Sequence, residues 1–445
     1  MRALAGAAVA DITPPVGSRM GGYGRRTTPA TGIIDPLLVR ALVLSDGSSD
    51  IAIAVCDLLG VGSDVVSSSR ALIEAQVGIP SDRVLVAATH THAGPSGFRA
   101  AEDPAYTDVL ARQVAGAVAM ARARLEPVTV KLGKVDVATI SQNRRDPAGP
   151  VQTAAHVLLA DTLAGGPPVA TLVNFACHAT VLEHDNLEYS PDFPGATARM
   201  VESCLGGTAV YLQGACGDVN PVWSRHDRAE VERVGGVLGG AAVRLAQEMR
   251  PLGAGQWCIN LSWSEDVEVP CPGRLVAPLS LAGARTELEL PRQPRRTVEE
   301  VDADLRGMEA RLAELPETDP GGRRALRARI NELATARLFP LLPSGKTTQR
   351  LEVQALRLSE ECAVVTLPGE FFAETGAELA RRCGLPGLLV AGYANGSVGY
   401  VPPAGAFPEG GYEVGMTQFG PDAEAAIVDA AVETVASLYV RPAGP

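Results

Sequence analysis

Basic residues are scarce in this chain of 445 residues, and they form no cluster anywhere along it. Lys and Arg number 39 against 51 Asp and Glu, which gives a formal net charge of -12 at pH 7. A protein with this charge repels a phosphate backbone, so we do not expect nucleic acid as a partner. Long apolar runs are also lacking. No segment approaches the roughly 20 apolar residues that cross a bilayer, so we expect no transmembrane segment.

The sequence also lacks a Cys-x-x-Cys pair and a convincing signal-peptide core. Its eight cysteines are scattered, mostly among apolar or glycine neighbours. This distribution favours buried free thiols over disulfides or a cysteine-rich zinc site. The weakly apolar run near the N-terminus leads into a proline-containing turn, unlike a secretory signal. We therefore expect a cytoplasmic protein.

Short apolar runs alternate along the chain with longer amphipathic stretches. The runs are rich in Val, Ile and Ala and nearly continuous, which is typical of strands covered on both faces. The predicted strands are 41–44, 51–55, 84–88, 169–175, 209–212, 362–367 and 388–391. The predicted helices are 63–76, 105–125, 193–204, 229–249, 371–383 and 422–439. The alternation predicts an α/β layered fold, with a mixed β-sheet core flanked by helices, in a single domain of residues 1–445.

Residues 297–338 depart from this pattern, because they form two charged amphipathic stretches interrupted at 316–322. The interruption predicts an antiparallel helical hairpin inserted into the domain. Its charges are explained as a solvated face, with a partner-binding role as the alternative. The preceding segment, 271–296, is rich in Pro and Arg and is expected to loop across the surface.

Histidines follow two of the predicted strands. The chain has only six histidines, yet His90 and His92 both follow the run 84–88. If that strand persists to its end, the two rings lie on the same face. They can then share a metal, or combine one ligand with one proton-transfer group, although a stacked structural pair is an alternative. His178 follows the run 169–175, and alone it would more often be a satisfied core histidine than a ligand.

Three further strands end in polar residues. These are Asp218 and Asn220 after 209–212, Glu370 after 362–367, and Tyr393, Asn395 and Tyr400 after 388–391. In α/β sheets, ligands bind in the crevice outside the carboxyl ends of the strands. Two histidines and a carboxylate are a recurrent catalytic zinc set that leaves a position for water. The five strand ends together therefore predict a zinc site.

The motifs, taken in order, resemble those of the neutral, non-lysosomal ceramidases and their shorter bacterial relatives. The resemblance covers nearly the whole chain, from ITPPVG and MGGYG through GIIDPLLVRALVL, ATHTHAGP, QNRR, NFACHATVL, GACGDVNP and PGEFF to the region of Tyr400. It implies a zinc-dependent hydrolase that cleaves an amide bond to an acyl chain. The C-terminal immunoglobulin-like domain of the full-length enzymes is not expected here.

The resemblance also implies roles for individual residues. By motif, zinc would be held by four ligands, His90, His178, Glu370 and Tyr400. His92 would lie beside the water that the metal activates, and Arg144 near the substrate carbonyl. Where the family carries a serine in a GDVSP motif, proposed to take part in catalysis, this sequence reads GDVNP with Asn220. An amide side chain cannot act as a nucleophile.

The expected reaction is hydrolysis of a small-molecule amide or ester by water that zinc activates. His92 would move protons, and Arg144 or Asn220 would stabilise the developing oxyanion. Cys216, the obvious thiol near Asn220, has no basic neighbour in sequence that would favour its thiolate. Zinc-activated water is therefore the expected nucleophile.

Other residues near these motifs are weaker candidates. Asp218 is expected to fix its glycine-rich turn, and Asp192 to cap the helix 193–204. Trp223, Phe371 and Tyr412 could line an apolar acyl pocket, although core packing is the simpler interpretation for each.

Two other functions stay open. A non-catalytic binding homologue would retain the fold and bind zinc poorly. A metallophosphoesterase commonly needs two metals and more aspartates than these motifs supply.

Overall fold

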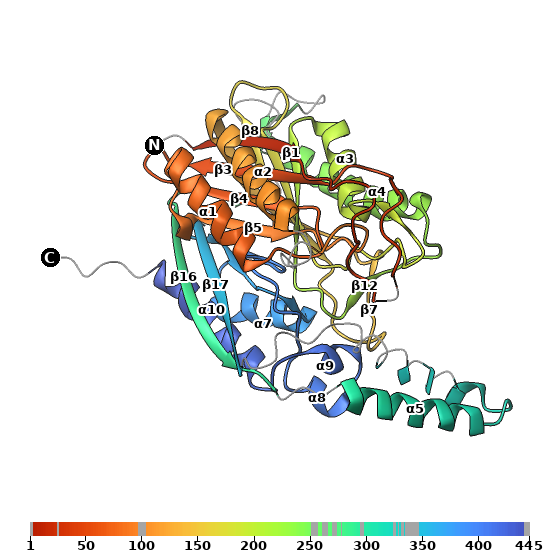
Figure 1. Cartoon of the computed structure of the whole chain (residues 1–445). Coiled ribbons are helices and arrows are strands. Elements are labelled where there is room, and N and C mark those ends of the chain that lie inside the picture. The colour runs from red at the N-terminus through yellow and green to blue at the C-terminus, as the bar shows by residue number, and fades with distance from the viewer. Residues whose placement is uncertain are drawn as a thin grey trace.

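The computed structural model describes most of the chain. The described residues are 3–24, 26–96, 104–250, 257–259, 266–268, 274–276, 278–293, 298–323, 326–327, 329–330, 333 and 347–439. They form two stacked β-sheets with helices on both outer faces (Figure 1).

The larger sheet is mixed. Within the described residues it contains nine strands in the order β11 (Thr208–Gln213), β9 (Ala170–Phe175), β8 (Ala154–Thr162), β6 (Glu126–Asp136), β1 (Leu4–Asp11), β3 (Leu38–Ser45), β4 (Asp50–Cys56) and β5 (Val84–Ala88), with β15 (Arg274–Leu275) beside β6. The pairs β4–β5 and β9–β11 are parallel, and the other neighbours are antiparallel. The two edge strands β11 and β5 also contact each other, so the sheet is strongly curved. This curvature brings the ends of β5, β9 and β11 to one place.

The smaller sheet has the order β16 (Ala282–Pro291), β17 (Thr348–Ser359), β18 (Cys362–Thr366) and β20 (Gly387–Ala391). Buried aliphatic side chains from both sheets, such as Leu42, Leu172 and Val364, form one cluster between them. Strands whose two faces are both covered need apolar residues at successive positions, which explains the continuous apolar runs.

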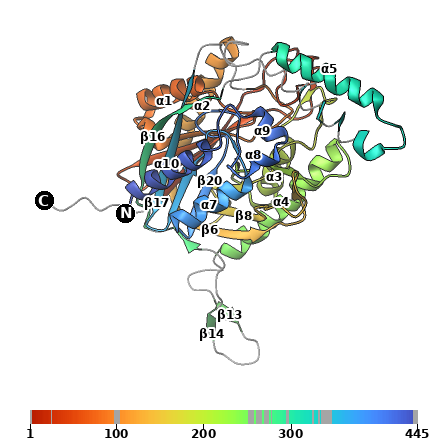
Figure 2. The ribbon, with the colours of Figure 1, turned by 90° about the horizontal axis from the view of Figure 1, so that it is seen from below.

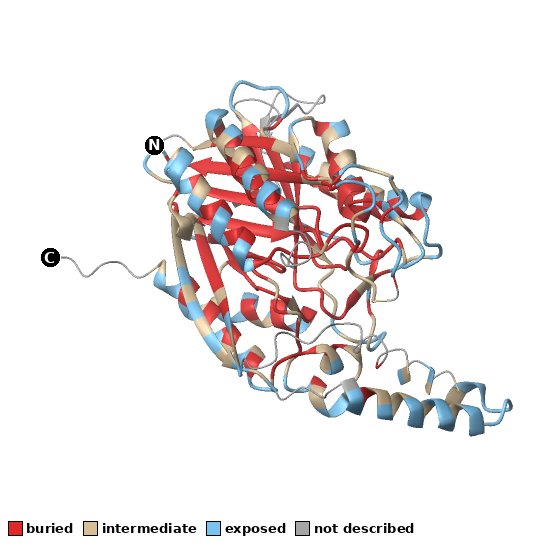
Figure 3. Ribbon diagram, viewed as in Figure 1, coloured by how far each residue is buried: buried red, intermediate tan, exposed pale blue. Residues whose placement is uncertain are grey.

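A layer of helices covers the outer face of each sheet, so the fold has four layers. The outer face of the larger sheet carries α1 (Ser63–Val77), α2 (Pro104–Ala123), α3 (Asp192–Leu205) and α4 (Arg228–Met249). The outer face of the smaller sheet carries α7 (Ala373–Cys383) and α10 (Ala423–Ser437). The buried residues of these helices face the sheets, while their other sides are exposed (Figure 3). Among the described residues, no helix is both long and apolar enough to cross a membrane.

Several short elements lie outside the two sheets. They are β2 (Gly32–Ile33) with β10 (Glu188–Tyr189), β7 (Ser141–Asn143) with β12 (Val219–Pro221), β19 (Glu370–Phe371) with β21 (Tyr400–Val401), β13 (Trp257–Ile259) with β14 (Asp266–Glu268), and the helices α8 (Ala406–Glu409) and α9 (Tyr412–Met416). The pairs β7–β12 and β19–β21 carry residues that sequence analysis assigned to the site.

The predicted α/β layered class is confirmed, and each of the seven predicted strands and six predicted helices has a counterpart. The expectation of a surface loop over 271–296 is wrong, because β16 occupies Ala282–Pro291 and pairs with β17. From Ala284 onward its residues alternate between exposed and partly buried positions. An edge strand with one solvent-exposed face shows this alternation from residue to residue and lacks a continuous apolar run.

The segment 297–338, predicted as a helical hairpin, is described in part. Its first helix is α5 (Val298–Glu314), which projects from the body of the molecule (Figure 2). The backbone N–H of Gly322 donates to Asp319 Oδ1 where the second helical stretch begins. Part of the segment 324–338 lies outside the described residues.

The prediction of free thiols holds for the six cysteines whose side chains are described. Four of these are buried, whereas Cys383 is partly exposed and Cys204 is exposed on α3. The expectation of burial is therefore wrong for Cys204. The side chain of Cys258 and the whole of Cys271 lie outside the described residues.

Candidate metal centre

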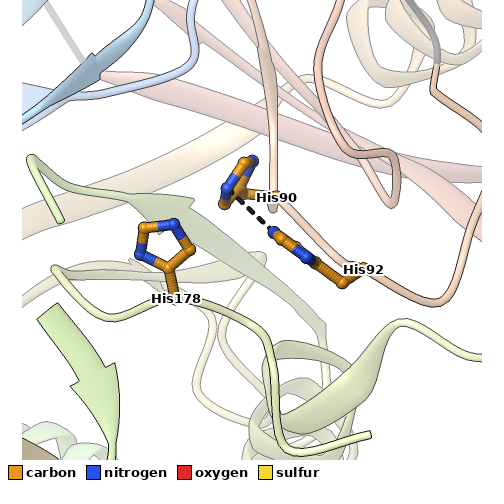
Figure 4. A group of neighbouring side chains, drawn as sticks. All are labelled: His90, His92 and His178. Atoms are coloured by element: carbon orange, nitrogen blue, oxygen red, sulfur yellow. Dashed lines mark hydrogen bonds between the residues drawn. The ribbon is translucent and has the colours of Figure 1, made fainter. Parts of the chain in front are cut away.

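Three histidines meet beyond the carboxyl ends of β5 and β9 (Figure 4). The candidate ligand atoms of His90, His92 and His178 all lie within 4.8 Å of one another, and all three residues are buried. The Nε2 atoms of His90 and His92 are 3.2 Å apart. The structure therefore brings together the histidines that follow two separate predicted strands.

The two histidines after β5 converge for a reason other than strand alternation. β5 ends at Ala88, and His90 has a φ of 63°, in the left-handed region. The strand therefore does not persist to His92, which was the condition for expecting both rings on one face. A non-glycine residue holds this conformation only where its surroundings enforce it. Tyr393, itself at a φ of 53°, stacks on the His90 ring with the ring centroids 3.9 Å apart.

Backbone carbonyls orient two of the rings. His90 Nδ1 lies 2.7 Å from the carbonyl oxygen of Leu59, and His178 Nδ1 lies 2.6 Å from that of Cys216. A carbonyl oxygen only accepts, so the Nδ1 atoms carry the protons and donate them. The lone pairs then reside on the Nε2 atoms. Metal-binding histidines in proteins are oriented by the same kind of contact.

Glu370 completes this group from the strand β19. Its Oε2 atom lies 3.3 Å from His178 Nε2 and 3.5 Å from His90 Nε2. Two ligands of a tetrahedral zinc, each about 2.0–2.1 Å from the ion, are about 3.3 Å apart. His178 Nε2 and Glu370 Oε2 are buried and have no hydrogen-bond partner. Leaving such atoms unpaired is costly, and a cation between them would remove that cost.

The protonation states also suit metal binding. Burial and, after it, the charge of Arg144 lower the pKa of His178 to about 4, although Glu370 acts in the opposite direction. Burial raises the pKa of Glu370, but His90 and His178 outweigh it and hold that pKa well below its usual range. At neutral pH the ring is therefore neutral and the carboxyl is ionised, as metal ligands must be.

Tyr400 lies beside Glu370, because β21 pairs with β19 in parallel and these two residues are opposite each other. Arg144 Nη2 donates a hydrogen bond of 3.0 Å to the Tyr400 hydroxyl. Burial raises the pKa of this phenol, and the Arg144 charge opposes the rise. A neighbouring cation is what a tyrosine needs if it is to bind a metal through its oxygen.

The Arg144 side chain donates hydrogen bonds to three residues. Besides Tyr400, its Nη1 donates to Asn220 Oδ1 at 3.3 Å and its Nε to Glu413 Oε1 at 2.7 Å. The second oxygen of Glu413 accepts from Arg145 Nη1, also at 2.7 Å. Glu413 is a buried residue of α9, so α9 is anchored to the site through two adjacent arginines.

The two weaker aspartate candidates have structural contacts. Asp218 Oδ1 accepts from the N–H of Ala373 and its Oδ2 accepts from Asn143 Nδ2. Asp192 accepts from the N–H groups of Leu182 and Phe193 at the start of α3. Asp218 thus joins the start of α7 to the end of β7. The expectation that Asp192 caps α3 is wrong, because the N-cap residue is Pro191 and no side-chain hydrogen bond caps that helix.

The three aromatic candidates lie in three different places. Phe371 is fully buried in the core beneath the smaller sheet. Tyr412 packs edge-on against Tyr400 with the ring centroids 5.6 Å apart, so it borders the site. Trp223 lies against His226, with 5.3 Å between the centroids. Core packing thus explains Phe371, and Tyr412 remains a candidate for contact with substrate.

The residues that contact His92 and keep it in place were not predicted from the sequence. The Tyr23 ring contacts the His92 ring edge-on at 4.9 Å, and Arg26 Nη1 donates to the His92 carbonyl at 2.7 Å. Gly22 has a φ of 94°, and a Cβ there would lie 2.6 Å from His92 Cγ. The glycine-rich motif MGGYG was the available signal, because the chain can pass this close to a ring only where a side chain is missing.

Sequence comparison finds ceramidases among the proteins that this chain resembles. Residues 4–222 match the family described as neutral/alkaline non-lysosomal ceramidase, N-terminal. The N-terminal half of the chain is thus similar to neutral ceramidases. The chain is 30% identical over 243 residues to the neutral ceramidase of Mycobacterium tuberculosis, a stretch that covers 47% of this chain and 37% of that protein. The chain thus matches well under two thirds of this ceramidase's length.

Solved ceramidase structures share the fold. The neutral ceramidase from Pseudomonas aeruginosa superposes with a TM-score of 0.73 and 21% identity, over 99% of this chain and 75% of that one. A structure described as ceramidase complexed with C2 gives a TM-score of 0.73 and 19% identity, over 98% and 75% of the two chains. The similarity in fold therefore covers nearly all of the chain and continues beyond the family match at residue 222.

Proposed function

We propose that the chain is a zinc-dependent hydrolase that cleaves amide or ester bonds in small molecules. The observation that carries this proposal is the pair of buried, unpartnered atoms His178 Nε2 and Glu370 Oε2, with His90 Nε2 beside them. These residues and Tyr400 would hold the metal. Zinc at such a site polarises a carbonyl and lowers the pKa of water towards about 7.

His92 is proposed to transfer protons. Its Nδ1 atom is buried without a hydrogen-bond partner, while its Nε2 atom faces His90. Burial, together with His90 and His178, holds the pKa of His92 well below its usual value. The ring is therefore neutral at pH 7 and can accept a proton from the attacking water. It would then donate that proton to the leaving nitrogen or oxygen.

Asn220 is proposed to stabilise the oxyanion. The Oδ1 atom of Asn220 accepts a hydrogen bond from Arg144, and this contact orients the amide. The Nδ2 group is then the part of the amide that can donate to substrate. A donor held in this way can bind the negative oxygen that forms during acyl transfer. In this proposal Arg144 orients both Asn220 and Tyr400.

The nucleophile is proposed to be water. Burial raises the pKa of the Cys216 thiol far above its usual value. Its Sγ atom lies 3.2 Å from the Tyr393 hydroxyl, which is not a base that would take the thiol proton. A thiol in this environment is a poor nucleophile.

The substrate class follows from the relatives. Several of them are named ceramidases, so an amide of a fatty acyl chain is the proposed substrate. The site combines residues from Gly22 to Glu413, which supports one domain over residues 1–445 with the segment 297–338 inserted in it.

The proposal is tested by metal analysis followed by a hydrolysis assay. Purified protein should contain one zinc per chain, and His178→Ala should lose it, whereas the control His184→Ala should keep it. His184 is half exposed and pairs with Glu183 outside the metal centre. Fluorescent N-acyl amides and esters of increasing chain length would then identify the substrate.

Three results would contradict the proposal. Metal-free protein after mild purification, or undiminished zinc in His178→Ala, would refute the metal assignment. Zinc binding without cleavage of any acyl substrate would favour the non-catalytic homologue, and two metals per chain with phosphatase activity would favour a metallophosphoesterase.

A further inference from the structure

The strands that lead to His90 and His178 have no common hydrogen-bond ladder. β5 is at one edge of the larger sheet, whereas β9 lies next to β11 at the other edge. Main-chain pairing within the sheet therefore does not set the separation of these two strand ends, and the isolated bridge between Thr91 and Ala179 joins the two segments only beyond His90 and His178. Another contact must set it if the two Nε2 atoms are to be held at ligand spacing.

Gln213 provides that contact. It is the last residue of β11, and it is fully buried. Its Nε2 donates to the carbonyl of Thr89 at 3.1 Å and to the carbonyl of Cys177 at 2.8 Å. Thr89 directly precedes His90, and Cys177 directly precedes His178.

The oxygen of the Gln213 amide also takes part in hydrogen bonds. Gln213 Oε1 accepts from the backbone N–H groups of Cys177 and Gly214, each at 3.1 Å. The Tyr211 hydroxyl also donates to it, at 3.2 Å. These contacts fix which way the amide points, so its two N–H groups must face the two carbonyls.

We infer that Gln213 is a positioning residue for the proposed metal centre, because its amide fixes the spacing of the strand ends that carry His90 and His178. This inference rests on the proposed zinc site. A second tie lies on the far side of the ligands, where the N–H of His92 donates to the carbonyl of Ala179 at 3.1 Å. The two ties enclose the ligand-bearing residues, and Gln213 is the one made by a side chain.

The test is the variant Gln213→Met, which keeps the length of the side chain and removes both donors. Zinc affinity is measured by competition with a chromophoric chelator, and ligand geometry by the visible absorption of the cobalt-substituted protein. Loss of a group that orients ligands typically weakens metal binding 10- to 100-fold, so we expect a loss on the order of 10-fold or more. The cobalt bands should shift as well.

Gln354→Met is the matched control. Gln354 is also fully buried, and its Nε2 donates to two carbonyls, those of Asp82 at 2.9 Å and Val84 at 3.2 Å. These lie at the start of β5, at the opposite end from His90. Gln354→Met should lower the melting temperature of the metal-free protein comparably, yet bind zinc with unchanged affinity and an unchanged cobalt spectrum.

The outcomes separate the inference from the function on which it rests. If the wild-type protein binds no zinc, the proposed function fails. If the wild type binds zinc and Gln213→Met binds it equally well, or Gln354→Met loses as much affinity, only the inference is overturned. Should Gln213→Met not fold, Gln213→Asn is the second variant, since its shorter amide cannot reach both carbonyls. Wild-type affinity in that variant would equally overturn the inference.

Discussion

Replacing Glu413 with glutamine tests whether the two arginines beside it hold the site in its working geometry. Glu413 accepts from Arg144 and Arg145 through separate oxygens at 2.7 Å, and its own side chain is only 3% exposed. The change keeps the shape and one acceptor, and it removes the negative charge. It therefore leaves two guanidinium groups without their common counter-ion.

The expected loss of stability follows from burial. Removing one partner of a buried ion pair costs about 3–5 kcal/mol. The side chains of Arg144 and Arg145 are 20% and 14% exposed, so water solvates part of the stranded charge. Glutamine also keeps one hydrogen bond. We therefore expect Glu413→Gln to lower the free energy of unfolding by about 2–3 kcal/mol, at or below the lower end of that range.

The effect on activity is expected through Arg144. A less firmly held guanidinium no longer fixes Tyr400 and Asn220, so turnover should fall by 10- to 100-fold, as is typical when an orienting partner is lost. The assays are urea unfolding followed by circular dichroism, and steady-state kinetics at full zinc occupancy. Glu230→Gln is the control, because Glu230 is also buried and pairs with an arginine, Arg233 at 2.8 Å, away from the site.

The same variant has a pH signature. Burial raises the pKa of Glu413, but Arg144 and Arg145 outweigh it, so the folded pKa is lower than that of an ordinary glutamate. A depressed pKa stabilises the fold above the unfolded pKa, about 4.3, and this stability is lost as the pH falls through the folded value. The difference between wild type and Glu413→Gln should therefore shrink below about pH 4.3. Unchanged turnover in Glu413→Gln, or an equal loss in Glu230→Gln, would refute the reasoning.

Three further predictions concern the catalytic groups. His92→Ala should keep its zinc and lose about 10²–10⁴-fold in turnover, as expected for a general acid–base, and loss of the zinc would show that His92 is a ligand. Asn220→Ala should raise the activation free energy by roughly 3–4 kcal/mol, and so lower turnover, with zinc retained. Cys216→Ala should leave turnover nearly unchanged. An acyl group found on Cys216 by mass spectrometry would reverse that assignment. Gly22→Ala should displace His92 and reduce activity more than Gly17→Ala, because both glycines have a positive φ but a Cβ at Gly17 meets nothing within 4 Å.

Sequence analysis predicted those parts of the molecule that depend on local pattern. The strand Val84–Ala88 was predicted with the bounds that the structure has, because each of its residues is buried and apolar. Glu370 also lies beside His90 and His178, as the motif order implied. Strands β1 and β17 were overlooked. In β1 the apolar run 4–10 is made mostly of Ala and Gly, and it was considered only as a possible signal-peptide core. Strand β17 mixes buried with partly exposed positions and so lacks a continuous apolar run.

The supporting contacts of the site could not be predicted in the same way. Arg144 and Glu413 are 269 positions apart in the sequence, and nothing near either residue indicates the other. Gln213 lies in an apolar strand, where its amide signals only that a polar group is buried. Such pairings depend on how the sheet curves and on how the two sheets stack. A single sequence gives no local signal for either.

The distribution of the site along the chain has a consequence for folding. The proposed metal ligands reach from His90 to Tyr400, so the loops between them must close before a metal can be held. A ligand that binds only the native state stabilises it by about 2.7 kcal/mol at 100 times its dissociation constant. Zinc would therefore couple the stability of the N-terminal and C-terminal halves. A fragment that ends near residue 222 would contain both histidine ligands and still lack the carboxylate, so it would gain little of this stabilisation.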